Sequence, residues 1–309
     1  MKILDSSDKG ILEISWSPDS QWVIYTAGKE IRLANAESGE VRTIGEGTAP
    51  RITTENRVLF ENEGQIHAAE GTRIRTVVAM SQLVKETPKG LPLPSPDGES
   101  MIFVVYNVFD KVSQSLNAYP YRHFIGMATP TGSDARMTKE QWYGGGAFWF
   151  PDSSRFAHFE FDSTAGPQIH IATRKGKKAG QLAGLYPSIS PDGSHLAAKP
   201  RGGGSIMVYE SKGEWDESVT MNVIKLPITK SNRPSASPPI WLDNRVVIVV
   251  EEEGAFRVDT KRDRAEPIKK FPVPTDRRNP TIVPSPDREL LAMEVAVEGG
   301  FELRVSKPL

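Results

Sequence analysis

Cysteine is absent from the 309 residues of this chain. Its absence excludes disulfides, thiolate metal sites and a cysteine nucleophile, and leaves the redox compartment open. Long hydrophobic runs are missing too: no apolar stretch approaches the roughly 20 residues of a membrane span. The first ten residues, MKILDSSDKG, lack the apolar core of a signal peptide. As given, the chain is expected to be cytoplasmic, or periplasmic or secreted if a signal peptide has been removed.

An excess of charge of one sign is also missing. The net charge is −1 at pH 7, so the chain has no global attraction to nucleic acid or to an anionic membrane. We therefore expect no nucleic-acid partner. Glycine and proline, in contrast, are plentiful, with 26 and 24 residues. Because both residue types set turns, the composition indicates a globular chain with many of them.

The segment YPSISPDGSHLAA, residues 186–198, is one copy of an internal repeat. Four further copies are clear and two are weaker: SWSPDSQWVIYTAG from Ser15, LPSPDGESMIFVV from Leu93, WFPDSSRFAHFEF from Trp149, VPSPDRELLAMEV from Val283, RITTENRVLFENE from Arg51 and IWLDNRVVIVVEE from Ile240. The acidic residue of the turn recurs every 36 to 55 residues, near the period of about 40 residues of a propeller blade. Proline presets φ and aspartate bonds to the backbone that follows it. Ser-Pro-Asp-Gly is therefore expected to be a structural turn.

Each copy predicts four short strands. One strand leads into the turn, a second rich in Val, Ile and Phe follows it, a third comes after a glycine-containing turn, and a polar fourth strand closes the unit. Repeated units of this kind are typical of a β-propeller. We predict an all-β, seven-bladed β-propeller that forms a single domain over residues 1–309, with blades at approximately 11–45, 49–80, 91–138, 144–183, 186–228, 238–272 and 280–309 plus 2–5.

The N-terminal strand is expected to close the ring. The chain ends after GGFELRVSKPL, so the seventh unit lacks a fourth strand, while KILD at residues 2–5 precedes the first complete unit. Pairing these two segments would leave no exposed strand edge between the first and last blades.

At these turns the chain resembles the TolB-like propeller repeat, whose mark is an aromatic residue, Ser-Pro-Asp-Gly and a buried strand. The match is good at Trp16–Ser20, Ser95–Gly98 and Ser190–Gly193, fair at Phe150–Ser153 and Ser285–Arg288, and poor at Glu55 and Asp243. The resemblance covers essentially the whole chain and implies the fold. It implies little about function, because relatives include periplasmic assembly proteins, propeller domains of prolyl-oligopeptidase-type peptidases and pectate-oligomer lyases.

Insertions into the regular units indicate where function sits. The largest interrupt blade three: NVFDKVSQSLNAYPYR between its second and third strands, and MTKEQWYGGGAFW between its fourth strand and blade four. Both belong to one face of the ring. They bring together residues of the types that dominate binding hot spots, namely Tyr119, Tyr121, Arg122, Trp142 and Tyr143. The alternative is that these aromatics pack the long loop onto its own blade.

Arginines from other blades are expected on the same face: Arg201, Arg233, Arg277 and Arg278, with Arg51 after the crossing from blade one to blade two. Guanidinium binds carboxylates and phosphates bidentately, so a ring of arginines would suit an anionic small ligand at the channel mouth. The alternative is that the set is coincidental, because arginine is common in loops. Asp162 and Asp276 would offset part of the positive field.

Signals of catalysis are sparse. Four of the five histidines fall in second or third strands, and only His123, at the end of the blade-three insertion, could reach the candidate face. Three ligands converging on one metal are therefore not expected. No Gly-x-Ser-x-Gly elbow occurs, and among the first strands Glu13 alone would place an acid in the channel. We predict no catalytic residue, no metal site and no cofactor. Trp215, in another insertion, is expected to be a packed side chain rather than a contact for a partner.

These observations favour a non-enzymatic scaffold that binds a protein or peptide on the face built from the blade-three insertions and the arginine loops. The alternative is a lyase, hydrolase or binding protein that acts on anionic oligosaccharides at the channel mouth. A propeller that serves a catalytic subunit is a third possibility. Metal dependence and the effect of a small ligand would separate the first two.

Overall fold

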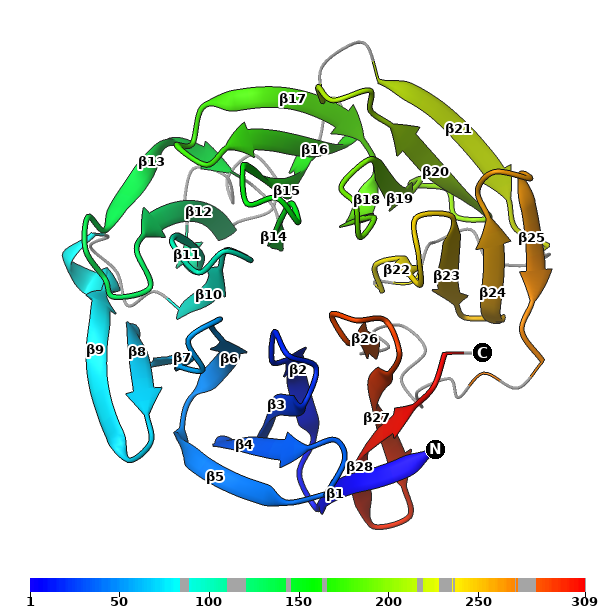
Figure 1. Ribbon diagram of the computed structural model, residues 1–309. Helices are drawn as coiled ribbons and strands as arrows, with labels where there is room; N and C mark the ends of the chain where they lie inside the picture. Colours follow the sequence, from blue (N-terminus) through cyan, green and yellow to red (C-terminus); the bar gives the residue numbers. More distant parts are fainter. Residues whose placement is uncertain are drawn as a thin grey trace.

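The computed structural model describes residues 1–83, 89–109, 121–142, 146–162, 166–215, 219–227, 235, 237–269, 271 and 282–308. In these residues the chain forms seven four-stranded antiparallel sheets, which are the blades of a ring around a central opening (Figure 1). The prediction of an all-β, seven-bladed β-propeller is confirmed. No helix in the described part of the chain is long and apolar enough to cross a membrane.

Blades 1 to 4 each begin with the strand nearest the channel and end with the outermost one. Blade 1 consists of β2 (Ile11–Trp16), β3 (Trp22–Ala27), β4 (Glu30–Asn35) and β5 (Val41–Glu46). Blade 2 consists of β6 (Thr48–Ile52), β7 (Val58–Asn62), β8 (Gln65–Glu70) and β9 (Arg73–Ala79), with the 3-10 helix η1 (Met80–Gln82) after it. Blade 3 consists of β10 (Lys89–Pro94), β11 (Met101–Phe109), β12 (Tyr121–Ala128) and β13 (Arg136–Trp142). Blade 4 consists of β14 (Ala147–Trp149), β15 (Arg155–Asp162), β16 (Gly166–Thr173) and β17 (Lys178–Ala183).

Blades 5 and 6 repeat this order, and blade 7 takes its outer strand from the N-terminus. Blade 5 consists of β18 (Leu185–Ile189), β19 (His195–Lys199), β20 (Ser205–Glu210) and β21 (Thr220–Lys225). Blade 6 consists of β22 (Ile240–Trp241), β23 (Val246–Glu251), β24 (Gly254–Asp259) and β25 (Arg264–Pro267). Blade 7 consists of β26 (Ile282–Pro284), β27 (Leu291–Val297), β28 (Gly300–Ser306) and β1 (Lys2–Ser7).

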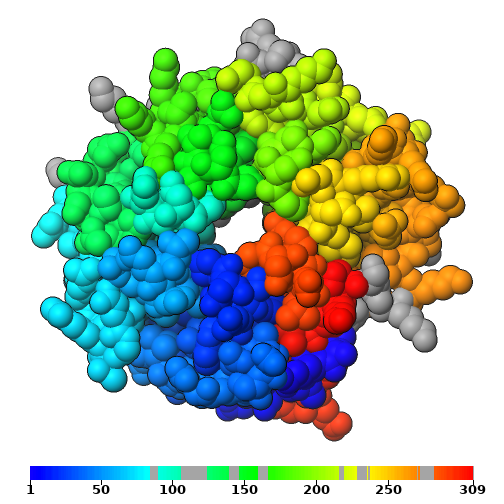
Figure 2. Space-filling model, viewed as in Figure 1, coloured from blue at the N-terminus to red at the C-terminus, as the bar shows by residue number. Residues whose placement is uncertain are grey.

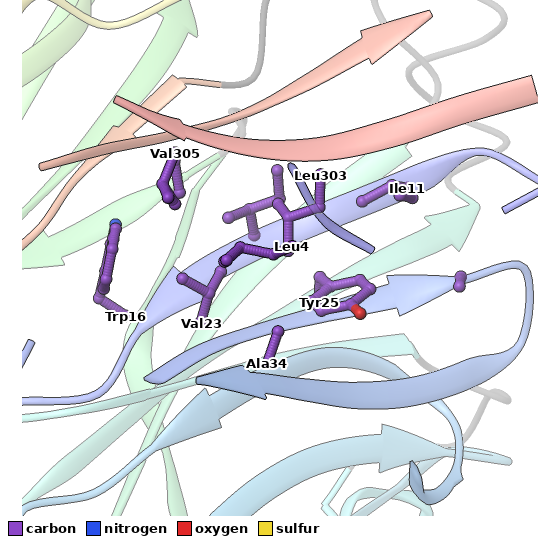
Figure 3. Packing of buried hydrophobic residues seen from close by; sticks show 11 residues of the cluster. Leu4, Ile11, Trp16, Val23, Tyr25, Ala34, Leu303 and Val305 are labelled. Carbon is purple, nitrogen blue, oxygen red and sulfur yellow. The ribbon is translucent and has the colours of Figure 1, made fainter. Parts of the chain in front are cut away.

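The N-terminal strand β1 closes the ring, as expected. It pairs antiparallel with β28, with Lys2 opposite Val305. Leu4 is buried, and Figure 3 shows it beside Leu303 of blade 7 and Tyr25 of blade 1. Strand β1 therefore joins the last blade by backbone pairing and the first blade by side-chain packing.

The Ser-Pro-Asp segments are turns between first and second strands, as their sequence predicts. In blade 3 the Ser95 hydroxyl donates to Asp97 Oδ1 at 2.6 Å, and the same oxygen accepts the backbone N–H of Glu99 at 3.0 Å. The aspartate thus holds both sides of its own turn, which is why the motif forms locally. We call the face of the ring that carries these turns the turn face, and the opposite face, which carries the connections from second to third strands and from blade to blade, the loop face.

Two hydrogen bonds repeat between neighbouring blades. A tryptophan Nε1 at the end of a first strand donates to a carbonyl of the preceding blade at 2.8–3.2 Å: Trp16 to Val283, Trp149 to Leu93 and Trp241 to Ser188. The side chain after the turn acid accepts the N–H of the preceding blade's aspartate at 3.0–3.2 Å: Ser20 from Asp287, Ser153 from Asp97 and Asn244 from Asp192. Blade 1 is joined to blade 7 in both ways, so the closing seam has the same bonds as the seams between blades 3 and 4 and between blades 5 and 6.

The hydrophobic core lies in the seams between blades. Each of the seven pairs of neighbouring blades encloses one cluster of buried apolar side chains. Trp215 belongs to the cluster between blades 4 and 5, where it is 2% exposed and meets the Phe150 ring edge-on at 5.4 Å. The prediction that Trp215 is a packed side chain is confirmed.

Blade 3 differs from its sequence-based description. Strand β11 continues to Phe109 and β12 begins at Tyr121, so that Phe109 pairs with Tyr121 beyond an irregularity in register. The expectation that Tyr121 and Arg122 lie in a loop is therefore wrong. Trp142, expected after the fourth strand, is the last residue of β13. Longer strand pairing satisfies more backbone groups than a loop would.

Candidate functional site: the central channel

The first strands of the blades line a channel through the ring, whose opening is visible in Figure 2. Two overlapping cavities, of about 610 and 560 Å³, occupy it. The first extends toward the loop face, where Gly146 and Pro238 line it. The second extends toward the turn face, where it is lined by prolines of the turns: Pro18, Pro96, Pro151, Pro191 and Pro286. Both include Arg51 and Arg288, so the channel is continuous past these two residues.

One position recurs along the channel wall, two residues before the start of each turn. All seven copies of this position lie in the described residues and line the channel: Ser15, Arg51, Leu93, Phe148, Ser188, Ile240 and Val283. Six of the seven residues are uncharged, and blade 2 supplies Arg51. This arginine was expected on the loop face; it lies within β6, lines both cavities and donates from Nη1 to the Pro50 carbonyl at 2.7 Å.

Arg288 occupies the turn of blade 7, directly after Asp287. Its φ is +66°, and the same turn position holds Gly98 at +75° and Gly193 at +74°. Its guanidinium lines the channel, and its Nε is buried without a hydrogen-bond partner among the described residues. Burial lowers the pKa of Arg288, and the carboxylate of Asp287 opposes this shift.

The charged residues among the described lining of the two cavities are Arg51 and Arg288. The remaining lining is mostly apolar, with aromatic side chains such as Phe148, Trp149 and Trp241. Charges act more strongly on one another beside such walls than in bulk water. The channel can therefore attract an anion, and its apolar wall can pack against a non-polar group.

The binding residues were predicted for the loop face, and the structure describes the position of four of them. Tyr121, Arg122 and Trp142 are brought together by backbone pairing, because Trp142 lies opposite His123 in the sheet. Arg201 lies in the exposed turn between β19 and β20. The other predicted residues lie outside the described residues: Tyr119, Tyr143, Arg233, Arg277 and Arg278.

In the sequence, three of the segments that hold these other residues come before channel-lining residues. Residues 143–145 precede Gly146, residues 228–234 precede β22, and residues 272–281 precede β26. Gly146, Pro238 and Ile282 all line the cavity nearer the loop face. Tyr143, Arg233, Arg277 and Arg278 are therefore near channel-lining residues in the sequence, and Tyr119 is not.

A buried ion pair lies beside the connection from blade 5 to blade 6. Lys199, 0% exposed, lies at the loop-face end of β19, and its Nζ is 3.0 Å from Glu251 Oε1. The same nitrogen donates to the Ser235 hydroxyl at 2.8 Å and to the Val250 carbonyl at 2.9 Å, while Glu251 accepts the Ser235 N–H at 2.8 Å. Burial lowers the pKa of Lys199 and Glu251 raises it in part. Ser235, in the crossing from blade 5 to blade 6, is held by both charged groups.

The side chains of Glu13, His158 and His170 are not part of the channel lining. Glu13, expected to line it, accepts the backbone N–H of Ala49 at 2.6 Å and is not among the described lining residues. His158 and His170 stack at 5.3 Å on the side of blade 4 that packs on blade 3. Burial, with a smaller contribution from His170, lowers the pKa of His158 to about 3. In the described part of the chain, no three His, Asp or Glu side chains gather as metal ligands would.

Sequence reasoning missed Arg288 and Lys199. A signal for Arg288 was present, because it stands where other turns of the repeat carry Gly98, Gly193 or Ser20. Lys199 carried no such signal, since its partner Glu251 lies in the next blade and only the folded ring brings the two together.

Comparison with known proteins supports the fold. An oligogalacturonate lyase in complex with manganese is 11% identical, with a TM-score of 0.66 over 95% of this chain and 88% of the lyase. A chain of the mitotic checkpoint complex is 12% identical, with a TM-score of 0.67 over 99% of this chain and 91% of the other. TolB from Acinetobacter baumannii is 16% identical over 83% of this chain and 63% of TolB, with a TM-score of 0.47.

No protein-family model and no curated protein sequence matches the chain. The comparisons thus show a seven-bladed β-propeller similar to both an enzyme and a component of a protein complex. The resemblance to the TolB-like repeat stays an interpretation of the turn motifs.

Proposed function

We propose that this protein is a non-enzymatic binding module that takes a protein or peptide segment at the loop-face mouth of the channel. The observation that carries the proposal is the channel wall. It is mostly apolar, with aromatic side chains, and it continues to the loop face. In the sequence, its loop-face residues follow the segments that hold Tyr143, Arg233, Arg277 and Arg278. Aromatic and arginine residues around an apolar pocket are the usual composition of a binding hot spot.

The seams support this proposal because they keep the mouth in place. Seven buried clusters hold the blades together, and the Lys199–Glu251 pair fixes Ser235 beside the mouth. A mouth on rigid elements can bind without first being ordered, which lowers the entropic cost of association.

Site-specific photo-crosslinking tests the proposal. A photoreactive amino acid at Arg201 reports on the loop face, and one at the exposed Glu37, in the turn between β4 and β5, reports on the turn face. We expect one partner to be captured from position 201 and not from position 37. Capture should be lost in the Tyr121→Ala, Trp142→Ala double variant.

A matched control is the Ile74→Ala, Val223→Ala double variant, whose exposed apolar residues lie on outer strands of two blades. It should retain capture. Capture from position 37 alone, or equal capture by both double variants, would contradict the proposed site.

A second candidate is an enzyme or binding protein for anionic oligosaccharides, and the arginines in the channel favour it. The similar fold of an oligogalacturonate lyase makes oligogalacturonate the first compound to try. Formation of an unsaturated product that requires manganese and stops on chelation would establish this candidate. If oligogalacturonate neither binds nor is cleaved with manganese present, this candidate is excluded for that substrate.

A further inference from the structure

Arg51 is a departure from its own repeat. At the equivalent wall position the other blades place Ser15, Leu93, Phe148, Ser188, Ile240 and Val283, all uncharged. The fold therefore does not need a charge at this position. The guanidinium of Arg51 therefore adds a charge and N–H donors to a channel wall that is otherwise uncharged at this position.

Arg288 is a second departure, at a different position of the repeat. Its φ of +66° is a conformation that suits glycine. Two other turns use Gly98 and Gly193 there, and three use the small polar residues Ser20, Asn56 and Ser153 at +59° to +62°. An arginine in this conformation is strained, because its Cβ crowds the backbone. The side chain also carries a buried Nε whose hydrogen has no acceptor among the described residues. The Oδ1 atom of the neighbouring Asp287 accepts instead from the Ser285 hydroxyl and the Glu289 N–H.

Both departures face the same space. Arg51 and Arg288 line both channel cavities, and they are the charged groups of the described lining. Two cations beside one apolar space repel each other, and an anion between them would turn this repulsion into attraction. Guanidinium groups present paired N–H donors that match the oxygens of carboxylate and phosphate.

We propose that Arg51 and Arg288 form a site inside the channel for one oxyanion, a carboxylate or a phosphate. The prolines of the turns and aromatic residues such as Phe148 surround the site and would pack against the non-polar part of the molecule that carries the anion. The site does not rest on the proposed protein partner, because a small anion alone would occupy it.

Titration calorimetry with two probes tests the site. Inorganic phosphate and citrate are titrated separately, at constant ionic strength set with sodium chloride. We expect saturable binding of at least one probe. Binding should be about ten- to a hundredfold weaker in Arg51→Gln and in Arg288→Gly, because a charge-assisted hydrogen bond pair is lost in each. Binding of phosphate alone assigns a phosphoryl ligand, and binding of citrate alone assigns a carboxylate ligand.

The control variant is Arg264→Ala, which removes the same charge from the exposed outer strand of blade 6, where Arg264 pairs with Glu266. It should bind both probes as the wild type does. Arg288→Gly restores the residue that two other turns carry, so it is expected to fold. The site is refuted if neither probe binds the wild type, or if the two channel variants bind as tightly as the control. Either result leaves the crosslinking test of the proposed function unaffected.

Discussion

Lys199 in the seam between blades 5 and 6 and Arg288 in the channel differ in how their nitrogen donors are matched. In the seam between blades 5 and 6 the fully buried Lys199 is matched by a carboxylate, a hydroxyl and a carbonyl. In the channel the buried Nε of Arg288 finds no acceptor in the described protein. A buried donor without an acceptor is unfavourable, whereas a matched one is not. Substitutions in the seams should therefore lower stability, and substitution of Arg288 should not.

Removal of residues 1–6 should have the largest effect, because it opens the closing seam. The backbone pairing of β1 with β28, the buried Leu4 and the bonds of Asp5 to Tyr25 and Arg32 would be lost together. We expect a loss of at least about 5 kcal/mol, enough to unfold a domain of ordinary stability. Thermal unfolding followed by circular dichroism measures it, with removal of residues 307–309 as the control. An unchanged Tm would show that β1 is dispensable.

Lys199→Met should follow, with a loss of about 3–5 kcal/mol, because it leaves Glu251 as a buried charge without its cation. Urea unfolding measures the change. The Lys199→Met, Glu251→Leu double variant removes both charges and should recover much of the loss. As a control, Arg264→Ala breaks an exposed ion pair and should cost less than about 1 kcal/mol. A loss of that small size for Lys199→Met would mean that the buried pair does not hold the seam.

Acidification should weaken the seam between blades 3 and 4 through His158. Its pKa is about 3 in the folded protein, below its ordinary 6.5, so between these values the unfolded chain binds a proton that the folded chain does not. This contribution to stability is present above pH 6.5 and is lost as the pH falls toward 3. From pH 6.5 to 5 we expect a loss of roughly 1.5 kcal/mol. Urea unfolding at both pH values should show this slope in the wild type and a smaller one in His158→Phe; equal slopes would assign the effect to other groups.

The ring was predictable from sequence because its determinants are local. Each Ser-Pro-Asp turn is closed by its own aspartate, as Asp97 illustrates, and the alternating strands follow at a regular period. Even the closing strand could be inferred, because the seventh repeat was one strand short.

The candidate site was less predictable, because it depends on which blades meet. Arg122 and Trp142 lie within strands because β12 pairs with β11 and β13 in blade 3. The sequence contained no sign of the register of this pairing. Arg288 was readable as an exception to the small residues that other turns carry at its position, such as Gly98 and Ser20, but its place in the channel follows only from closure of the ring. The partner of Lys199 lies in another blade and could not be read from its neighbours in sequence.

The measurement that tests the contrast between seams and channel most directly is the Tm of Arg288→Gly, with and without the anion that binds the wild type. Without anion, the variant loses backbone strain and a buried charge, so its Tm should rise by about 2 °C, which corresponds to roughly 1 kcal/mol in a chain of this size. With anion, the Tm of the wild type should rise and that of the variant should not. A variant that is less stable than the wild type, or that responds equally to the anion, would place Arg288 among the stabilising groups and contradict this account of the channel.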